Sequence, residues 1–272
     1  LILRPLLRAE LPPHENVGVN RRQLWSAALV ALGAMGLQLA GQRIEWWSVA
    51  WLAGGLALLW FGLPALLPAG FRIGGRGLDA VIGTRAAISA GYAGAQSFLP
   101  LMLVQAEGFS LQNAGIFITT GSVGWMAGAW LQSRPWLRLR RDLIIIVGAG
   151  SLAVGLVAIA IAAWLPGRLV PLTVAGWVLA GLGMGLAVAS TSLAVMQLSA
   201  PVEIGRNTSS LQVGEALGGG IGAGLAGTMF VLGTSQANPT LGFGGLLTLM
   251  AVLSLLGLAA AVRVGEVENH SV

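Results

Sequence analysis

Eight long apolar runs constrain the fold of this chain more than any other feature of its sequence. Each is about 20 residues long, the length that an α-helix needs to cross a bilayer core of roughly 30 Å. The runs occupy residues 24–40, 47–67, 78–104, 112–131, 143–165, 170–197, 205–232 and 241–262. With 56% hydrophobic and only 9% charged residues, the chain cannot cover its own surface against water. We therefore predict an all-α polytopic membrane protein with about eight transmembrane helices.

The arginines predict how these helices are oriented. Cytoplasmic loops of membrane proteins carry an excess of basic residues, and one set of linkers and tails holds twelve arginines against two in the opposite set. The first set comprises Arg4, Arg8, Arg21, Arg22, Arg72, Arg76, Arg134, Arg138, Arg140, Arg141, Arg206 and Arg263, and the second comprises Arg43 and Arg168. This asymmetry predicts cytoplasmic termini. Because all fifteen basic residues are arginine, as is typical of a GC-rich bacterial gene, we expect the bacterial plasma membrane.

Residue types that enzymes need are missing from the apolar runs. The chain has no cysteine, and His14 and His270 both lie near a terminus. An intramembrane serine protease needs a histidine base, a metal centre needs clustered ligands, and a phosphate-binding loop of the common type needs lysine. We expect no enzymatic activity, no cofactor and no metal. The basic residues are spread over short loops, so we also expect no binding of nucleic acid.

Two ionisable residues inside the runs are the best functional candidates. Arg85 lies in run 78–104 and Glu215 in run 205–232, and an unpaired charge there costs about 2.5–3.5 kcal/mol on insertion scales. Both runs enter from the cytoplasmic side, so counting 1.5 Å per residue places the two groups at similar depth. We predict that they face a shared polar interior and can pair. A carboxyl in such surroundings would be a natural site of proton uptake and release.

Polar neighbours extend both positions into stripes at helical spacing. The candidate residues of a substrate or proton pathway are Arg85, Ser89, Tyr92, Gln96, Thr208, Gln212, Glu215 and Trp125. Weaker candidates are Ser190, Thr191, Ser192 and Gln197 in run 170–197, and Thr119, Thr120 and Ser122, with Trp125, in run 112–131. Serine and threonine in a span usually bond only their own backbone. Two alternatives stay open: the stripes form a structural network, or Arg85 extends to the membrane interface.

Glycines spaced four apart indicate close helix packing. They are Gly124 and Gly128, Gly181 and Gly185, and Gly214, Gly218 and Gly222. Structural packing is one interpretation of this pattern, and a mobile contact between helices is the other.

The later runs resemble conserved helices of major facilitator transporters, especially drug-efflux-like members of actinobacterial type. LPAGFRIGGRGLDAVIGTRAAISAGYAGAQSFLPLML and GFSLQNAGIFITTGSVGWMAGAWLQSR resemble the seventh and eighth helices, and VLAGLGMGLAVAS and LGGGIGAGLAG the tenth and eleventh. The cytoplasmic basic loop, Arg134, Arg138, Arg140 and Arg141, stands where the family has G-x-x-x-D-R-x-G-R-R. Gln132 stands near the expected aspartate, and the glycine within the loop is missing.

This resemblance, which covers residues 63–262, implies a domain organisation. Residues 1–23 would be a cytoplasmic linker, 24–70 the two accessory transmembrane helices of a fourteen-span member, 71–265 a six-helix C-terminal transporter bundle, and 266–272 a cytoplasmic tail. The chain would then be a fragment whose partners are the lipid bilayer, a missing N-terminal six-helix half, a small-molecule substrate and protons.

The family resemblance implies proton-coupled efflux of small amphipathic molecules by alternating access. The alternative is a self-contained eight-span membrane protein that acts as a channel or as a structural or assembly partner. Six further apolar spans upstream in the gene would favour the transporter over the alternative.

Overall fold

A computed structural model describes residues 21–42, 47–68, 70–134, 139–234 and 239–267. These residues form eight α-helices and one short 3₁₀ helix, and they contain no strand. The α-helices are α1 Arg21–Gln42, α2 Ser48–Leu66, α3 Leu78–Gln105, α4 Leu111–Gln132, α5 Arg141–Ala163, α6 Val170–Leu198, α7 Ile204–Thr234 and α8 Pro239–Ala261, and the 3₁₀ helix is η2 Pro201–Glu203. All α-helix ends lie within three residues of the predicted runs. The predicted all-α class is confirmed.

Some predictions concern residues outside the described ranges. These are most of the linker (residues 1–20), most of the tail (residues 268–272), Arg43 and the loop residue Arg138.

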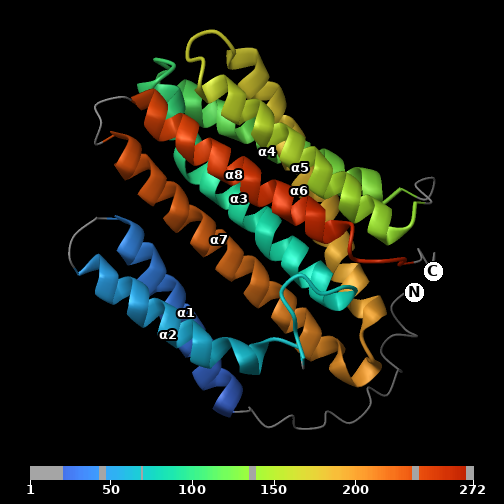
Figure 1. Ribbon diagram of the computed structural model, residues 1–272. Coiled ribbons are helices and arrows are strands. Elements are labelled where there is room, and N and C mark those ends of the chain that lie inside the picture. The colour runs from blue at the N-terminus through green and yellow to red at the C-terminus, as the bar shows by residue number, and fades with distance from the viewer. Residues whose placement is uncertain (1–20, 43–46, 69, 135–138, 235–238, 268–272) are drawn as a thin grey trace, which may run out of the picture.

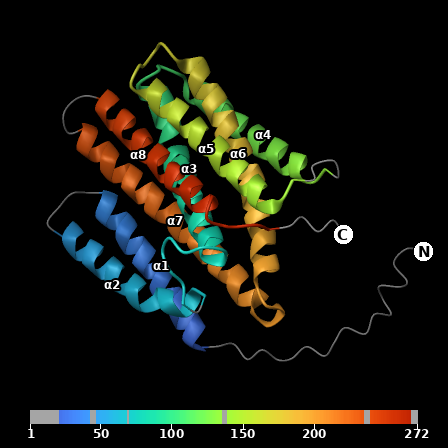
Figure 2. The same cartoon turned by 45° about the vertical axis from the view of Figure 1, so that its right-hand side comes forward.

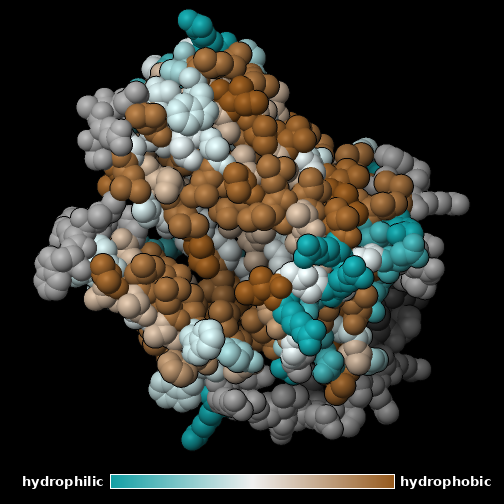
Figure 3. Space-filling view, in the orientation of Figure 1, coloured by the Kyte–Doolittle hydropathy of each residue, from teal (hydrophilic) through white to brown (hydrophobic). Residues whose placement is uncertain are grey.

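The helices and the surface are those of a polytopic membrane protein. Within the described residues, six helices are long and apolar enough to cross a membrane, namely α2, α3, α5, α6, α7 and α8, and α1 carries a shorter apolar stretch, Leu24–Ala40. Figure 3 shows apolar residues over much of the visible surface, and large side chains such as Trp60 and Phe61 are 78% and 73% exposed. An apolar surface of this extent is solvated by lipid.

The less apolar α4 runs between the same two ends of the molecule as its neighbours (Figure 1). Its lower hydropathy has a cause in its sequence, because it carries Gln112, Asn113, Thr119, Thr120 and Ser122.

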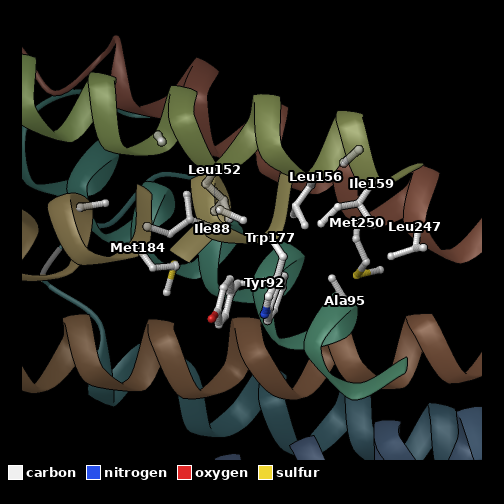
Figure 4. Close-up of a cluster of buried hydrophobic side chains, with 14 of the residues drawn as sticks. Ile88, Tyr92, Ala95, Leu152, Leu156, Ile159, Trp177, Met184, Leu247 and Met250 are labelled. Carbon is white, nitrogen blue, oxygen red and sulfur yellow. The ribbon is translucent and has the colours of Figure 1, made fainter. Parts of the chain in front are cut away.

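The helix α3 is the centre of the bundle, where it contacts each of α4 to α8. The core around it includes Leu152, Trp177 and Met250, all fully buried (Figure 4). The pair α1 and α2 pack on each other and join the rest of the protein mainly through α7 (Figures 1 and 2). The helix α7 therefore lies between this pair and the central helix.

Glycines let two helix pairs approach to backbone contact. A Cβ atom at Gly124 of α4 would overlap the carbonyl oxygen of Val178 on α6. A Cβ atom at Gly218 of α7 would overlap the backbone of Ala86 on α3, and Gly222 meets Ala90 in the same way. The close helix packing that the glycine pattern predicted is confirmed at these positions, and whether the contact moves stays a prediction.

One end of the bundle, here called the arginine-rich end, carries Arg76, Arg140, Arg141, Arg206 and Arg263. At this end, residues 262–267 form a strap after α8. Arg263 donates from Nη1 to the carbonyl oxygen of Gly74 at 3.0 Å and accepts from the amide of Gly77 at 3.2 Å. The amide of Arg141 donates to Val267 at 2.9 Å. The strap thus connects the segment before α3 to the first residue of α5. Gly74 and Gly77 have φ of +78° and +61°, a region that favours glycine.

Candidate functional site

The two charged residues predicted to pair form an ion pair between α3 and α7. Arg85 Nη2 donates to Glu215 Oε2 at 3.0 Å. The Arg85 side chain is 2% exposed and the Glu215 side chain 30% exposed. The predicted pairing is therefore confirmed, and the alternative in which Arg85 extends to the membrane interface is wrong. The pathway role of the two residues stays a prediction.

Arg85 also binds the neighbouring helix α6. Its Nη1 atom donates to the carbonyl oxygen of Val188 and to Oγ1 of Thr191. Thr191 is fully buried. One guanidinium group therefore joins α3, α6 and α7, with Nη1 bonded to α6 and Nη2 bonded to α7.

Several polar atoms near the pair on α3 are buried without a hydrogen-bond partner. They are Arg85 Nε, Ser89 Oγ and Thr84 Oγ1. Buried polar groups in proteins are normally satisfied by protein or by ordered water. The interior side of α3 around Arg85 therefore carries polar atoms that its protein neighbours do not satisfy.

The other members of the predicted stripes are distributed differently. Tyr92 is buried two turns from Arg85, whereas Gln96 is exposed. On α7, Thr208 is half-buried and Gln212 exposed. The structure thus gathers Arg85, Ser89, Tyr92 and Glu215 towards the interior and leaves both glutamines on the surface of the bundle.

An aromatic cluster adjoins the α3 stripe. Tyr92 stacks on Trp177 of α6 with ring centroids 4.8 Å apart and an interplanar angle of 9° (Figure 4). Trp125 of α4 meets Tyr92 edge-on at 5.6 Å and 74°. Trp177 is fully buried and donates from Nε1 to the carbonyl oxygen of Ile118 at 3.1 Å, whereas Trp125 is only partly buried. Trp125 is thus the ring of this cluster that has a partly exposed surface.

The sequence interpretation did not single out Trp177. The position of Trp177 in the sequence could have indicated a role in the core. Tryptophans of membrane proteins are concentrated at the two interfaces, whereas Trp177 lies in the interior of an apolar run. Val188, which contributes only a carbonyl oxygen, has no comparable signal.

The predicted basic loop contains arginines in three different environments. Arg140 donates to both carboxylate oxygens of Asp142, at 3.1 and 2.7 Å, and to Glu266 at 2.7 Å. These hydrogen bonds, led by the one to Asp142, raise the pKa of Arg140 above its ordinary value. The guanidinium of Arg134 stacks over the Trp130 ring at 4.0 Å, and Arg141 donates from its backbone amide to the strap. The loop arginines are thus partly structural.

Acidic and histidine side chains do not gather into a metal site in the part of the chain that the structure describes. No group of three or more residues with metal-binding side chains occurs there.

Comparison with known proteins finds a partial relative. The chain is 31% identical over 155 residues to the multidrug resistance protein B homolog of Mycobacterium tuberculosis. The matched region covers 57% of this chain and 28% of that protein. The chain thus spans less than a third of the relative that it matches. No family model matches the chain.

Proposed function

We propose that this chain forms part of a secondary active transporter that exports small amphipathic molecules in exchange for protons by alternating access. The observation that carries the proposal is the Arg85–Glu215 ion pair within the membrane-spanning bundle. The similarity to a multidrug resistance protein supports efflux as the direction of transport. Ionisable residues at membrane depth usually mark a substrate or ion pathway.

The proposal extends to family, partners and location. We place the chain in the major facilitator superfamily as the C-terminal portion of a fourteen-span member of actinobacterial type. Its partner would be an N-terminal six-helix half, and it would lie in the bacterial plasma membrane with both ends of this chain in the cytoplasm. The resemblance of residues 63–262 and the distribution of arginines support these assignments.

The two side chains of the pair differ in exposed fraction and in chemistry. Glu215 is 30% exposed, whereas Arg85 is 2% exposed and an arginine stays charged in proteins. Glu215 is thus the member of the pair whose charge can change, and it is the proposed site of proton exchange. Protonation replaces a charge-assisted pair by a weaker hydrogen bond. The strength of the contact between α3 and α7 then depends on the proton.

The partly exposed aromatic ring supports the class of substrate. Trp125 offers a partly buried ring that meets Tyr92, and Tyr92 lies two turns along α3 from Arg85. An amphipathic molecule would place its apolar part against such a ring and its polar part towards the pair.

Replacement of the carboxyl group tests the proposal. In the complete gene product, reconstituted into liposomes with an imposed pH gradient, we expect Glu215→Gln to reduce gradient-driven efflux of a fluorescent amphipathic compound to the level of protein-free liposomes. Glutamine keeps the shape and a hydrogen-bond acceptor for Arg85 but cannot carry a proton.

The matched control is Glu203→Gln, because Glu203 is an exposed carboxylate in η2, directly before α7. This variant should retain the wild-type flux. Gradient-driven flux that survives in Glu215→Gln would make Glu215 a structural residue. A wild-type flux that does not depend on the pH gradient would favour a channel over a proton-coupled transporter.

A further inference from the structure

We propose that Thr191 of α6 is a positioning residue that holds Arg85 in place while Glu215 gains and loses its proton. This inference rests on the proposed function, because it assigns a role within the same proton-coupled site. Thr191 contacts Arg85 and lies on a different helix from Glu215.

The hydroxyl of Thr191 is oriented towards Arg85 by its own helix. It has one proton, and it lies 2.8 Å from the carbonyl oxygen of Ala187 and 2.9 Å from that of Val188. Because that proton is directed to the backbone of α6, the oxygen lone pairs are free to accept from Arg85 Nη1. Full burial of Thr191 removes water as a competing partner.

The two terminal nitrogens of Arg85 bind different helices, and this determines which contact changes when Glu215 is protonated. Nη1 binds α6 through Thr191 and Val188, whereas Nη2 binds α7 through Glu215. Proton uptake by Glu215 weakens only the Nη2 contact. Arg85 then stays attached to α6 and cannot follow Glu215 or turn towards the membrane interface.

The released helix is therefore α7. Its remaining packing against α3 includes two close contacts between small groups, Gly218 on Ala86 and Gly222 on Ala90, and the contact of Phe230 with Phe98, whose ring centroids are 5.3 Å apart. These contacts are apolar, so the ion pair is the charged contact between the two helices that depends on the proton. With the positive charge held at a fixed place, loss of the proton restores the pair and returns α7 to α3.

Arg85 is the charged group that acts directly on Glu215. The other ionisable side chains that the structure describes on the helices packed against α7 are Asp79 and Tyr92 of α3, Arg21 of α1 and Glu203 of η2. Asp79, Arg21 and Glu203 lie at the starts or in the first turn of their helices. Among these residues, Arg85 alone forms an ion pair with Glu215.

Two substitutions separate the hydroxyl from the size of the side chain. Thr191→Val keeps the shape and removes the acceptor, whereas Thr191→Ser keeps the acceptor. In the complete transporter in liposomes, we expect Thr191→Val to lower gradient-driven efflux about tenfold or more, the scale set by a hydrogen bond from a charged group. Exchange of labelled for unlabelled substrate without a gradient should stay within about twofold, since that exchange needs the folded site but no proton coupling. Thr191→Ser should retain both fluxes.

The outcomes distinguish this inference from the proposed function. Wild-type efflux in Thr191→Val, or equal losses in the serine and valine variants, overturns the positioning role even where Glu215→Gln has abolished coupled flux. Coupled flux that persists in Glu215→Gln overturns the proposed function and this inference together. Should Thr191→Val fail to fold, Thr191→Ala takes its place in the same two measurements.

Discussion

Asp142 shows, at the scale of one residue, how a buried carboxylate organises the arginine-rich end of the bundle. It is 5% exposed and accepts two hydrogen bonds from Arg140 and one from the amide of Val267 at 3.2 Å. Arg140 in turn reaches Glu266. The carboxylate therefore holds the strap against the start of α5 and satisfies a buried backbone donor.

Removal of this carboxylate should weaken the folded state. We expect Asp142→Ala to lower the free energy of unfolding by about 1.5–3 kcal/mol, because hydrogen bonds to a charged group contribute on this scale and the Val267 amide loses its partner. Thermal unfolding in detergent measures the effect. Glu266→Gln is the control, since that side chain is 81% exposed and exposed ion pairs contribute about 0–1 kcal/mol. Equal losses in the two variants would contradict the assignment.

At the scale of helices, contacts between backbones join two helix pairs beside the packing of large side chains. The α4–α6 and α3–α7 contacts place glycine on at least one partner, and such close approach gains dispersion energy that lipid contacts do not offer. A glycine is required only on the face that meets a neighbour. The helix α4 provides both cases, since Gly124 meets α6 whereas Gly115 has no atom within 4 Å of an added Cβ.

Two alanine substitutions on α4 test this difference. Gly124→Ala should destabilise the protein by about 1–3 kcal/mol, because the new methyl group meets backbone atoms of Val178 and Leu182 that cannot move aside independently. Gly115→Ala should be neutral or stabilise α4 by up to about 1 kcal/mol. Thermal unfolding of both variants in the same detergent decides the matter. Similar melting temperatures for the two variants would exclude the packing role of Gly124.

For the whole molecule, α7 connects the pair α1–α2 to the bundle. Leu217 of α7 packs against Val30 and Leu59 of the pair. Near the start of α7, Arg206 and Ser210 donate to carbonyl oxygens at the end of α2, those of Leu67 and Leu66, at 3.0 and 2.5 Å. These bonds satisfy carbonyls that a helix end leaves unpaired. A movement of α7 would therefore carry α1 and α2 with it.

The orientation of the molecule is open to a direct measurement, since the chain has no cysteine to remove. Ile73, Val202 and Leu111 are 98%, 93% and 82% exposed, the first two at the arginine-rich end and the third at the opposite end. Single cysteines at these positions should react differently with a membrane-impermeant maleimide on intact cells. We expect labelling of Leu111→Cys and protection of Ile73→Cys and Val202→Cys. The reverse pattern would place the arginine-rich end outside.

The sequence by itself determined the eight helices and the similar depth of Arg85 and Glu215, from which their pairing was predicted. A segment in lipid must satisfy its backbone polar groups internally, so an apolar run of sufficient length becomes a helix without help from distant residues. The depth of a charge then follows from counting residues along that helix. Both inferences use only local information.

Only the tertiary structure decided which helix accepts the hydrogen bonds from Arg85 Nη1. The two acceptors, Val188 and Thr191, lie 103 and 106 residues from Arg85 in the sequence. Their helix, α6, contains no charged residue from which this contact could have been predicted. The stacking of Tyr92 on Trp177 and the docking of the strap on Asp142 were decided in the same way. The neighbours of a helix and its rotation about its own axis depend on the packing of whole surfaces, which no single periodicity along the chain specifies.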